Sequence, residues 1–326
     1  MFSLKMVATE EAVGLMLAHD LTRIVPGEGK GPAFRRGHVV RPEDIPLLLS
    51  MGKEHLYVWE PIPGMIHEEE AAQRLARAGA GSGILWGPPS EGKVSLKAAH
   101  RGWLRVDAGR LERINAIGEI TIATLRDRTV VEEGTILAGC KVTPLVIEER
   151  QVAEAEAMGP WIEVKPFRAR PVGLIITGSE VFKGRIPDKF GPVVEEKVAR
   201  FGCPIVYKAY SDDQAAMTEE KIREAQAAGA EVILCTGGMS VDPDDATPGA
   251  IRRSGARVIT YGAPFLPGSM FMLAYLEGER PVMGLPGAVM FERETIFDHV
   301  LPAVLAGEVL TKQDFVRMGH GGLLPK

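Results

Sequence analysis

The chain has 326 residues, a length that a single hydrophobic core seldom serves, so we expect two or three domains and exclude a single small module. Hydrophobic residues make up 45% and charged residues 25%, a balance typical of a soluble globular protein and not of a disordered one. The formal net charge of -5, with no basic block along the chain, argues against non-specific binding to nucleic acid or to anionic membranes.

The cysteines and histidines restrict the kinds of site that the chain can build. Cys140, Cys203 and Cys235 are odd in number and far apart, so they predict neither a disulfide framework nor a CxxC metal site, and they fit a reducing cytoplasm. The seven histidines show neither HxxxH nor HxH spacing, which argues against a zinc enzyme. Residues 1–20 lack the features of a signal peptide, and no run approaches the ~18 apolar residues of a membrane span. We therefore expect a cytoplasmic protein with no nucleic-acid and no membrane partner.

The first 166 residues are broken by frequent Gly and Pro, which predicts short strands and turns. We expect residues 1–60 to form a small α+β subdomain with a helix over 42–49. We expect residues 61–166 to form a β-rich domain. Its predicted elements are a helix over 68–78, strands over 93–99, 119–125 and 134–147, and turns at Gly102, Gly109 and Gly139.

From residue 167 the chain alternates strand-like and helix-like segments. Val172–Ile176 is continuously apolar, as in a strand buried on both faces. An amphipathic helix that Gly202 ends follows, with one apolar stripe at Phe190, Val193, Val194 and Val198. Such alternation predicts a parallel sheet with right-handed crossovers. We therefore expect residues 167–326 to form an α/β domain of three αβα layers with a mostly parallel sheet and a short tail.

The remaining elements of this domain are predicted in the same way. Strands are expected over 204–210, 231–236, 257–261 and 281–285. Helices are expected over 214–228, 247–255 and 289–305. The second of these helices has Thr247 to cap it and Pro248 at its first helical position.

Polar residues and glycines follow three of the predicted strands. In an open parallel sheet, ligands bind beyond the carboxyl ends of the strands, where amides at helix starts point outward. That edge is expected to carry Thr177-Gly178-Ser179-Glu180, Ser211-Asp212-Asp213, and the segment from Thr236 to Pro248. In the last segment, Gly237 and Gly238 allow close approach of a phosphate or a planar ligand, and Ser240 and Thr247 offer hydroxyl groups. This edge of the sheet is therefore the candidate site.

Three carboxylates, Asp242, Asp244 and Asp245, lie within the same segment. Carboxylates repel a phosphate, so a site that combines them with amides and hydroxyls is best explained by an intervening divalent cation, for which magnesium is the obvious candidate. The alternative is that the three residues only cap the helix that begins at Thr247 and interact with its positive end.

The residues at this edge resemble a known signature. Thr236-Gly237-Gly238 followed by Asp245-x-Thr247-Pro248 is similar to the signature of molybdopterin-binding domains in the Mog-type adenylyltransferase, the MoeA-type molybdopterin molybdenumtransferase and gephyrin. Gly184–Pro192, which contains Asp188, resembles the Asp-containing loop of the same family. Gly284-Leu285-Pro286-Gly287 resembles its G-L-P-G turn. The three segments occur in the family's order between Val172 and Leu305.

The resemblance implies a pocket for the dithiolene pterin of the molybdenum cofactor, or for its adenylylated form. It implies that Asp188 and Asp245 are the catalytic carboxylates in magnesium-dependent adenylyl transfer or molybdate insertion, with Asp188, Asp242 and Asp245 as metal ligands. The residues expected to contact the pterin ligand are Thr177, Gly178, Ser179, Glu180, Asp212, Thr236, Gly237, Gly238, Ser240, Thr247, Pro286 and Gly287.

The chain departs from the molybdenumtransferase pattern in three segments, and as a whole it resembles a stand-alone group of molybdopterin-binding proteins. Its amino-terminal segment lacks the Met-Asp-Gly-Tyr-Ala motif of those enzymes. Ala288-Val289-Met290-Phe291 stands where those enzymes carry Asn-Pro-Val-Ser, and Leu266–Met270 replaces a Lys-Pro-Gly-Lys-Pro-like segment and lacks both lysines. The hypotheses are therefore a transferase of cofactor maturation, a carrier that hands the cofactor to a molybdenum-enzyme client, and a domain that binds another phosphorylated heterocycle. We expect a homo-oligomer in each case.

Overall fold

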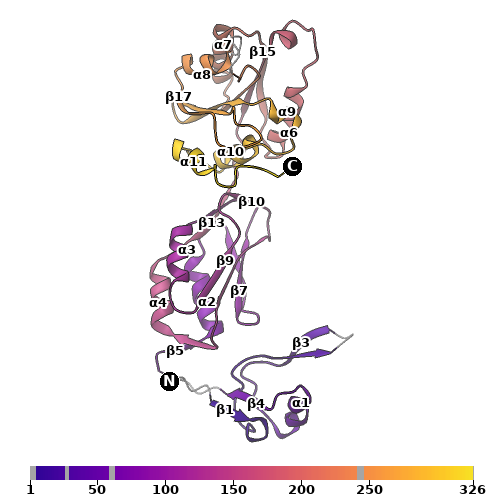
Figure 1. The fold of residues 1–326 in the computed structure, drawn as a ribbon, viewed down its shortest axis with the longest axis vertical. Helices are drawn as coiled ribbons and strands as arrows, with labels where there is room; N and C mark the ends of the chain where they lie inside the picture. Colours follow the sequence, from indigo (N-terminus) through magenta and orange to yellow (C-terminus); the bar gives the residue numbers. More distant parts are fainter. Residues whose placement is uncertain (1–4, 26–28, 59–62, 241–245, 326) are drawn as a thin grey trace. The chain divides into compact units, whose positions relative to one another are not determined.

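The computed structural model describes residues 5–25, 29–58, 63–240 and 246–325. The chain divides into two compact units, Met1–Lys165 and Pro166–Lys326 (Figure 1). The further division expected at residue 60 stays a prediction. Within the described ranges, no helix combines the length and the apolar character that crossing a membrane requires.

The N-terminal part of the first unit consists of short elements around a small core. Strand β1 (Lys5–Ala8) pairs antiparallel with β4 (His55–Val58), and β2 (Leu21–Val25) forms a hairpin with β3 (Gly29–Phe34). A 3-10 helix, η1 (Thr9–Glu11), follows β1, and a second, η2 (Pro42–Asp44), leads directly into helix α1 (Ile45–Ser50). The helix predicted over 42–49 is thereby confirmed. The core side chains include Leu17, Leu48, Leu56 and Val58.

The rest of the first unit is a layer of strands covered by helices. A four-stranded antiparallel sheet has the order β6 (Ile84–Trp86), β7 (Lys93–Ala98), β11 (Ile136–Val142), β9 (Ile120–Thr124). A second sheet has the order β10 (Thr129–Val131), β8 (Gly102–Val106), β13 (Ile162–Pro166), and β5 (Met65–His67) pairs with β12 (Val146–Glu148). The helices are α2 (Glu68–Gly79), α3 (Ala108–Asn115) and α4 (Glu149–Ala157), and α2 packs on β7 and β11.

The three turns predicted in this unit are wrong. Gly102 is the first residue of β8 and pairs with Val131 of β10. Gly109 lies in the first turn of α3, because Asp107 caps that helix by accepting a hydrogen bond from the Arg110 amide. Gly139 lies in the middle of β11, where it pairs with Ser95 on one side and Ala123 on the other. A helix cap fixes the backbone at Gly109 and strand pairing fixes it at Gly139, so neither glycine reverses the chain.

The second unit is built on one six-stranded sheet. Its order is β15 (Ile205–Ser211), β14 (Val172–Thr177), β16 (Val232–Thr236), β19 (Arg280–Leu285), β18 (Met272–Leu276), β17 (Arg257–Tyr261). The first four strands are parallel, whereas β18 runs antiparallel to both of its neighbours. The mostly parallel sheet expected from the apolar runs is confirmed. Every residue of β14 and β16 is buried, as central strands covered on both faces require.

Helices cover both faces of this sheet. Helices α7 (Ala215–Ala227) and α8 (Thr247–Arg253) contact each other, and their side chains share a core with Ile175 of β14. Helix α6 (Phe190–Ala199) contacts α9 (Ala288–Phe291) instead (Figure 1). The short helix α5 (Ser179–Phe182) follows β14, and α11 (Lys312–Arg317) closes the unit. The α/β class and the layered architecture are thereby confirmed.

Two predictions for the second unit are wrong in detail. The helix expected over 289–305 is two helices, α9 and α10 (Ile296–Leu305), because Thr295 and Asp298 form a capping box that starts a new helix. Strand β18 had no counterpart among the predicted elements. It lies between β17 and β19, so it completes the sheet beside the strand that carries the Gly284–Gly287 segment.

Candidate functional site at the strand ends of the six-stranded sheet

The turn that follows β16 can be built only from residues without side chains. Gly237 and Gly238 have φ angles of 80° and 54°. A Cβ atom at Gly237 would lie 2.5 Å from the carbonyl oxygen of Thr177, and one at Gly238 would lie 2.9 Å from Oγ1 of Thr247. No side chain of its own therefore covers the backbone of this turn, which allows a ligand to approach it closely.

Two threonine side chains hold the turn by hydrogen bonds to its backbone. Oγ1 of Thr177 donates to the carbonyl oxygen of Thr236 at 2.6 Å, and Oγ1 of Thr247 donates to the carbonyl oxygen of Gly237 at 2.9 Å. The two hydroxyl oxygens lie 3.2 Å apart, and both threonines are buried. The hydroxyl of Thr236, itself buried, has no hydrogen-bond partner among the residues that the structure describes. Hydroxyls of Thr177 and Thr247 thus fix the end of β16 to β14 and α8.

A cavity of about 430 Å³ opens above this turn. Three segments line it: 237–240 after β16, 268–270 before β18, and 286–288 after β19. We call it the glycine cavity, because each segment contributes at least one glycine. Every side chain among the described lining residues is uncharged. Its walls therefore offer mainly backbone groups, small hydroxyls and methionine side chains to a ligand.

Tyr261 and Gly284 hold one wall of the glycine cavity. The hydroxyl of Tyr261 lies 3.0 Å from the carbonyl oxygen of Met239 and 3.2 Å from that of Ser240, to which it can donate. The side chain of Met239 occupies the space above Gly284, where a Cβ atom would lie 2.4 Å from its sulfur. Two elements distant in sequence, β17 and β19, thus position the segment from Met239 to Ser240.

The residues that follow β14 and those that follow β15 form a separate polar cluster. The amide of Ser179 donates to Oδ2 of Asp213 at 2.8 Å, and its hydroxyl donates to Oδ1 of Asp212. Nζ of Lys183 lies 3.4 Å from Oδ2 of Asp212. The hydrogen bond from Ser179, followed by that from the Asp213 amide, lowers the pKa of Asp212 below its ordinary value. The cluster keeps the carboxylate of Asp212 ionised, while Glu180 is exposed.

Asp188 lies at the start of α6. Its Oδ1 accepts hydrogen bonds from the amides of Phe190 at 2.9 Å and of Gly191 at 2.8 Å. Its Oδ2 lies 3.7 Å from Nζ of Lys208 and accepts a 3.4 Å hydrogen bond from the hydroxyl of Tyr210. These contacts are those of a helix cap with an ion pair. They account for an aspartate at this position without a metal ion.

Of the three predicted metal ligands, the structure describes only Asp188. Asp242 and Asp245, together with Asp244, lie outside the described residues. Within the described part of the chain, no group of three or more His, Cys, Asp or Glu side chains is arranged to hold a metal ion. Asp188, which both a cation and two amides already engage, does not fit a magnesium ligand set by itself.

The predicted contact residues fall into three groups. The glycine cavity brings together Gly237, Gly238, Ser240, Pro286 and Gly287. Thr177, Thr236 and Thr247 lie beneath the turn, while Gly178, Ser179 and Glu180 follow β14 and Asp212 follows β15. Four residues of the site were not predicted: Gly268, Ser269, Met270 and Tyr261. Gly268 has a φ of 110° and lies in Leu266–Met270, the segment that differs from the molybdenumtransferase pattern. That Pro-Gly segment was the sequence feature that could have indicated these residues.

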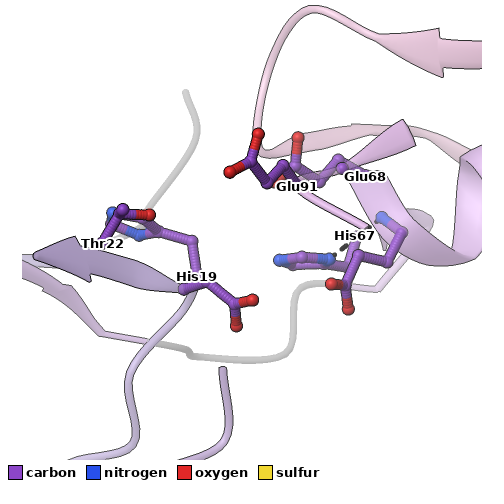
Figure 2. Close-up of a pocket in the computed structure, with 8 residues that line it drawn as sticks. His19, Thr22, His67, Glu68 and Glu91 are labelled. Atoms are coloured by element: carbon purple, nitrogen blue, oxygen red, sulfur yellow. Dashed lines mark hydrogen bonds between the residues drawn. The ribbon is translucent and has the colours of Figure 1, made fainter. Parts of the chain in front are cut away.

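The first unit contains a cavity lined by titratable side chains (Figure 2). It measures about 200 Å³, and His19, His67, Glu68 and Glu91 are among its lining residues. Nε2 of His67 donates to the carbonyl oxygen of Ala18 at 2.6 Å, while its Nδ1 accepts from the Glu69 amide at 3.2 Å. Burial lowers the pKa of His67 and of His19, and it raises the pKa of Glu68. The bonds of His67 require the neutral imidazole, so this histidine has a structural task.

Two parts of the chain match known families. Residues 6–60 match a family described as a domain of unknown function, and residues 173–306 match one described as "Probable molybdopterin binding domain". A molybdopterin molybdenumtransferase of Synechococcus elongatus is 28% identical over 158 residues, which are 46% of this chain and 38% of that protein. A CinA-like protein of Mycobacterium sp. is 31% identical over 81 residues, 25% of this chain and 19% of that protein. The chain thus spans less than two fifths of either relative.

Two solved structures are similar to part of the chain. The molybdopterin biosynthesis enzyme MoaB of Thermus thermophilus is 22% identical and covers 43% of this chain and 98% of its own, with a TM-score of 0.35. The tungsten cofactor synthesizing protein MoaB of Pyrococcus furiosus is 19% identical and covers 47% and 97%, with a TM-score of 0.33.

Proposed function

We propose that the glycine cavity binds molybdopterin and that the protein acts in molybdenum cofactor biosynthesis, because residues 173–306 match the family described as a probable molybdopterin binding domain. The observation that carries the proposal is the turn of Gly237 and Gly238, whose positive φ angles and absent side chains bring backbone to the cavity surface. The family match supports the ligand class, and the cavity supports the place.

The dimensions and chemistry of the glycine cavity suit a pterin that carries a phosphate. Its volume of about 430 Å³ lies within the range of roughly 300–1,000 Å³ that is usual for small-molecule sites. A planar ring can lie against backbone and methionine side chains, and amides at the turn can donate to phosphate oxygens. Because the lining side chains are uncharged, the negative charge of the phosphate would be stabilised by backbone amides and by groups outside the described lining.

The finer proposal is that bound molybdopterin undergoes adenylyl or molybdenum transfer. Positioning and charge neutralisation account for most of the catalysis of such transfers. A magnesium ion would supply that neutralisation, and we propose Asp242 and Asp245 as its ligands. We propose Asp188 as a further carboxylate of the reaction, although its present contacts serve α6.

The alternative to a transferase is a carrier, and the uncharged side chains that line the glycine cavity favour it. The glycine cavity presents uncharged side chains, and the carboxylate of Asp188 is engaged by two amides and a lysine. A protein with this site can hold the cofactor without changing it and deliver it to a molybdenum enzyme. A homo-oligomeric, cytoplasmic protein with such a client belongs to the same proposal, and light scattering and co-purification would test it.

Binding and turnover are measured on the full chain. Purified protein is titrated with molybdopterin, and the saturated complex is then incubated with magnesium and ATP while adenylylated pterin and released pyrophosphate are followed. Binding with turnover supports the transferase, and binding without turnover supports the carrier. Saturation by another phosphorylated heterocycle in place of molybdopterin would overturn the proposed ligand.

Asp245→Asn separates the two roles. The residue lies on the segment between β16 and α8, so we expect little loss of stability and complete loss of magnesium-dependent turnover, with molybdopterin binding preserved. Asp188→Asn is the companion variant, because an amide oxygen can still accept from the α6 amides while the charge is lost. Full turnover in Asp245→Asn would remove this residue from the reaction.

A further inference from the structure

A third cavity lies on the solvent face of the four-stranded sheet in the Met1–Lys165 unit. It measures about 630 Å³, and strands β7 and β11 form its floor, with residues 87–91 beside them. Helix α2 packs on the opposite face, where Val94, Leu96 and Cys140 are fully buried. Figure 1 shows α2, α3 and α4 on the same side of these strands. The cavity is therefore formed by the residues of β7 and β11 that point away from the core.

Lysines gather on this face because of the strand register. Lys93 pairs with Lys141, Ser95 with Gly139, and Lys97 with Ile136. Cross-strand partners project to the same face, so the three lysines share the cavity, which all of them line. We call it the lysine cavity. Like charges directly opposite each other destabilise a sheet, so the Lys93–Lys141 pair is unfavourable in the unliganded protein.

The lysines of this cavity differ from Lys197 and Lys208 of the second unit in their contacts. Lys197 pairs with Asp298 at 2.6 Å, and Lys208 pairs with Glu195 at 2.7 Å. Lys93, Lys97 and Lys141 form no ion pair with any residue in the described ranges. Glu91 is the single carboxylate among the described lining residues, against three ammonium groups, and Glu68, outside the lining, interacts electrostatically with Lys141. The cavity thus carries an excess of positive charge in a chain whose net charge is -5.

The side chain of Lys93 lies across the floor of the lysine cavity. Gly139 has no side chain, and a Cβ atom there would lie 3.4 Å from Cδ of Lys93, so the aliphatic part of this lysine crosses the floor. Ser90 and Ser95 add hydroxyl groups to the lining. Ammonium and hydroxyl donors around a shallow floor suit a small anion with several acceptor oxygens.

We propose that the lysine cavity is a binding site for a small molecule that carries a diphosphate or an equivalent pair of phosphate groups. Three ammonium groups match two or more negative charges, and lysine binds phosphate as a point charge. The volume of about 630 Å³ is that of a small-molecule site. The acidic chain as a whole repels a long polyanion, which favours a small molecule over a nucleic acid. This site is independent of the glycine cavity and of the function proposed for it.

The test titrates the full chain with pyrophosphate at low ionic strength by calorimetry. We expect saturable binding to the wild type and at least a tenfold loss of affinity in the double variant Lys93→Ala/Lys141→Ala. Lys5→Ala, an exposed lysine of β1 in the same unit, is the matched control and is expected to bind like the wild type. Equal affinity in the double variant and the wild type, or no saturation of the wild type, would overturn the proposal.

Two further measurements distinguish a loss of pyrophosphate binding from a folding defect and from a preference for another ligand. Removing the facing lysines should preserve or raise the thermal midpoint of the protein without ligand, whereas pyrophosphate should raise the midpoint of the wild type alone. Molybdopterin binding should be unchanged in the double variant. Tighter binding of a single-stranded oligonucleotide than of pyrophosphate, lost in the same double variant, would contradict the small-molecule assignment.

Discussion

The glycine cavity and the lysine cavity recognise ligands by different means. The first exposes backbone at Gly237 and Gly238, and its described side chains are uncharged. The second places three lysines on a flat sheet whose backbone is already paired. A backbone-built site depends on the conformation of a few glycines and on the threonines beneath them, so substitutions there affect stability and binding together. A site built from exposed side chains can lose its charges while the fold remains.

The largest effect is expected from Gly237→Ala. The added Cβ atom would lie 2.5 Å from the Thr177 carbonyl oxygen at a φ of 80°. We expect a loss of about 2–4 kcal/mol in the free energy of unfolding and the loss of molybdopterin binding. Gly229→Ala is the control, because Gly229 has a φ of 84° with open space around it. Its cost should be about 1 kcal/mol, with binding retained. Equal costs in chemical denaturation would contradict a steric requirement at Gly237.

Thr177→Val tests the support beneath the turn. The variant keeps the shape of the side chain and removes the hydroxyl that donates to the Thr236 carbonyl oxygen at 2.6 Å. Since that oxygen would lose a buried partner, we expect the free energy of unfolding to fall by about 1–3 kcal/mol and molybdopterin affinity to fall with it. Thr177→Ser retains the donor and should restore most of both, as urea unfolding and ligand titration would show. An unaffected affinity in Thr177→Val would mean that the turn does not need this hydroxyl.

Two variants of Asp188 test whether its charge has a role beyond capping α6. Asp188→Ala removes the acceptor of the Phe190 and Gly191 amides and should cost about 1 kcal/mol. Asp188→Asn keeps an acceptor and should be nearly as stable as the wild type by thermal unfolding. If magnesium-dependent turnover exists and disappears in both variants, the carboxylate has a role beyond the cap. If turnover falls only in Asp188→Ala, in proportion to its loss of stability, the role of Asp188 is limited to capping α6.

In the first unit, titratable side chains should make stability depend on pH. Burial holds the pKa of His67 below its ordinary value near 6.5, so the folded state favours the neutral ring. The contribution of neutral His67 to the free energy of unfolding is therefore complete above about pH 6.5 and is lost as the pH falls below that value. Denaturant unfolding at about pH 7.5 and about pH 5.5 should show lower stability at the acidic value. His67→Asn keeps a capping acceptor without the titration and should weaken the dependence, and an unchanged dependence would assign it to other groups.

The sequence predicted the second unit better than the first for a physical reason. Central parallel strands are buried on both faces, so β14 and β16 appear as continuous apolar runs, and the crossover helices between them have clear stripes. Strand β18 is equally apolar, but it is antiparallel and follows β17 through a loop, so no strand-helix alternation marks it. The break before Ile296 was readable in principle, since Thr295 and Asp298 have capping-box spacing.

The site was predicted from the sequence only where residues are adjacent along the chain. Gly237 and Pro286 belong to recognisable segments, and both line the glycine cavity. Tyr261 contributes through a hydrogen bond to a segment some twenty residues away, which no local pattern shows. The lysine cavity has the same origin, because Lys93 and Lys141 come together through the register of β7 and β11. Pairing register and side-chain packing, not composition, decide such contacts.

The most direct test of the account is equilibrium binding of molybdopterin to the full chain, compared with the Gly237→Ala and Gly229→Ala variants. The account predicts saturable binding by the wild type and by Gly229→Ala, and none by Gly237→Ala at temperatures where all three remain folded. Equal binding by the two variants would contradict the placement of the ligand at the turn after β16. A wild type that does not bind molybdopterin would contradict the proposed function itself.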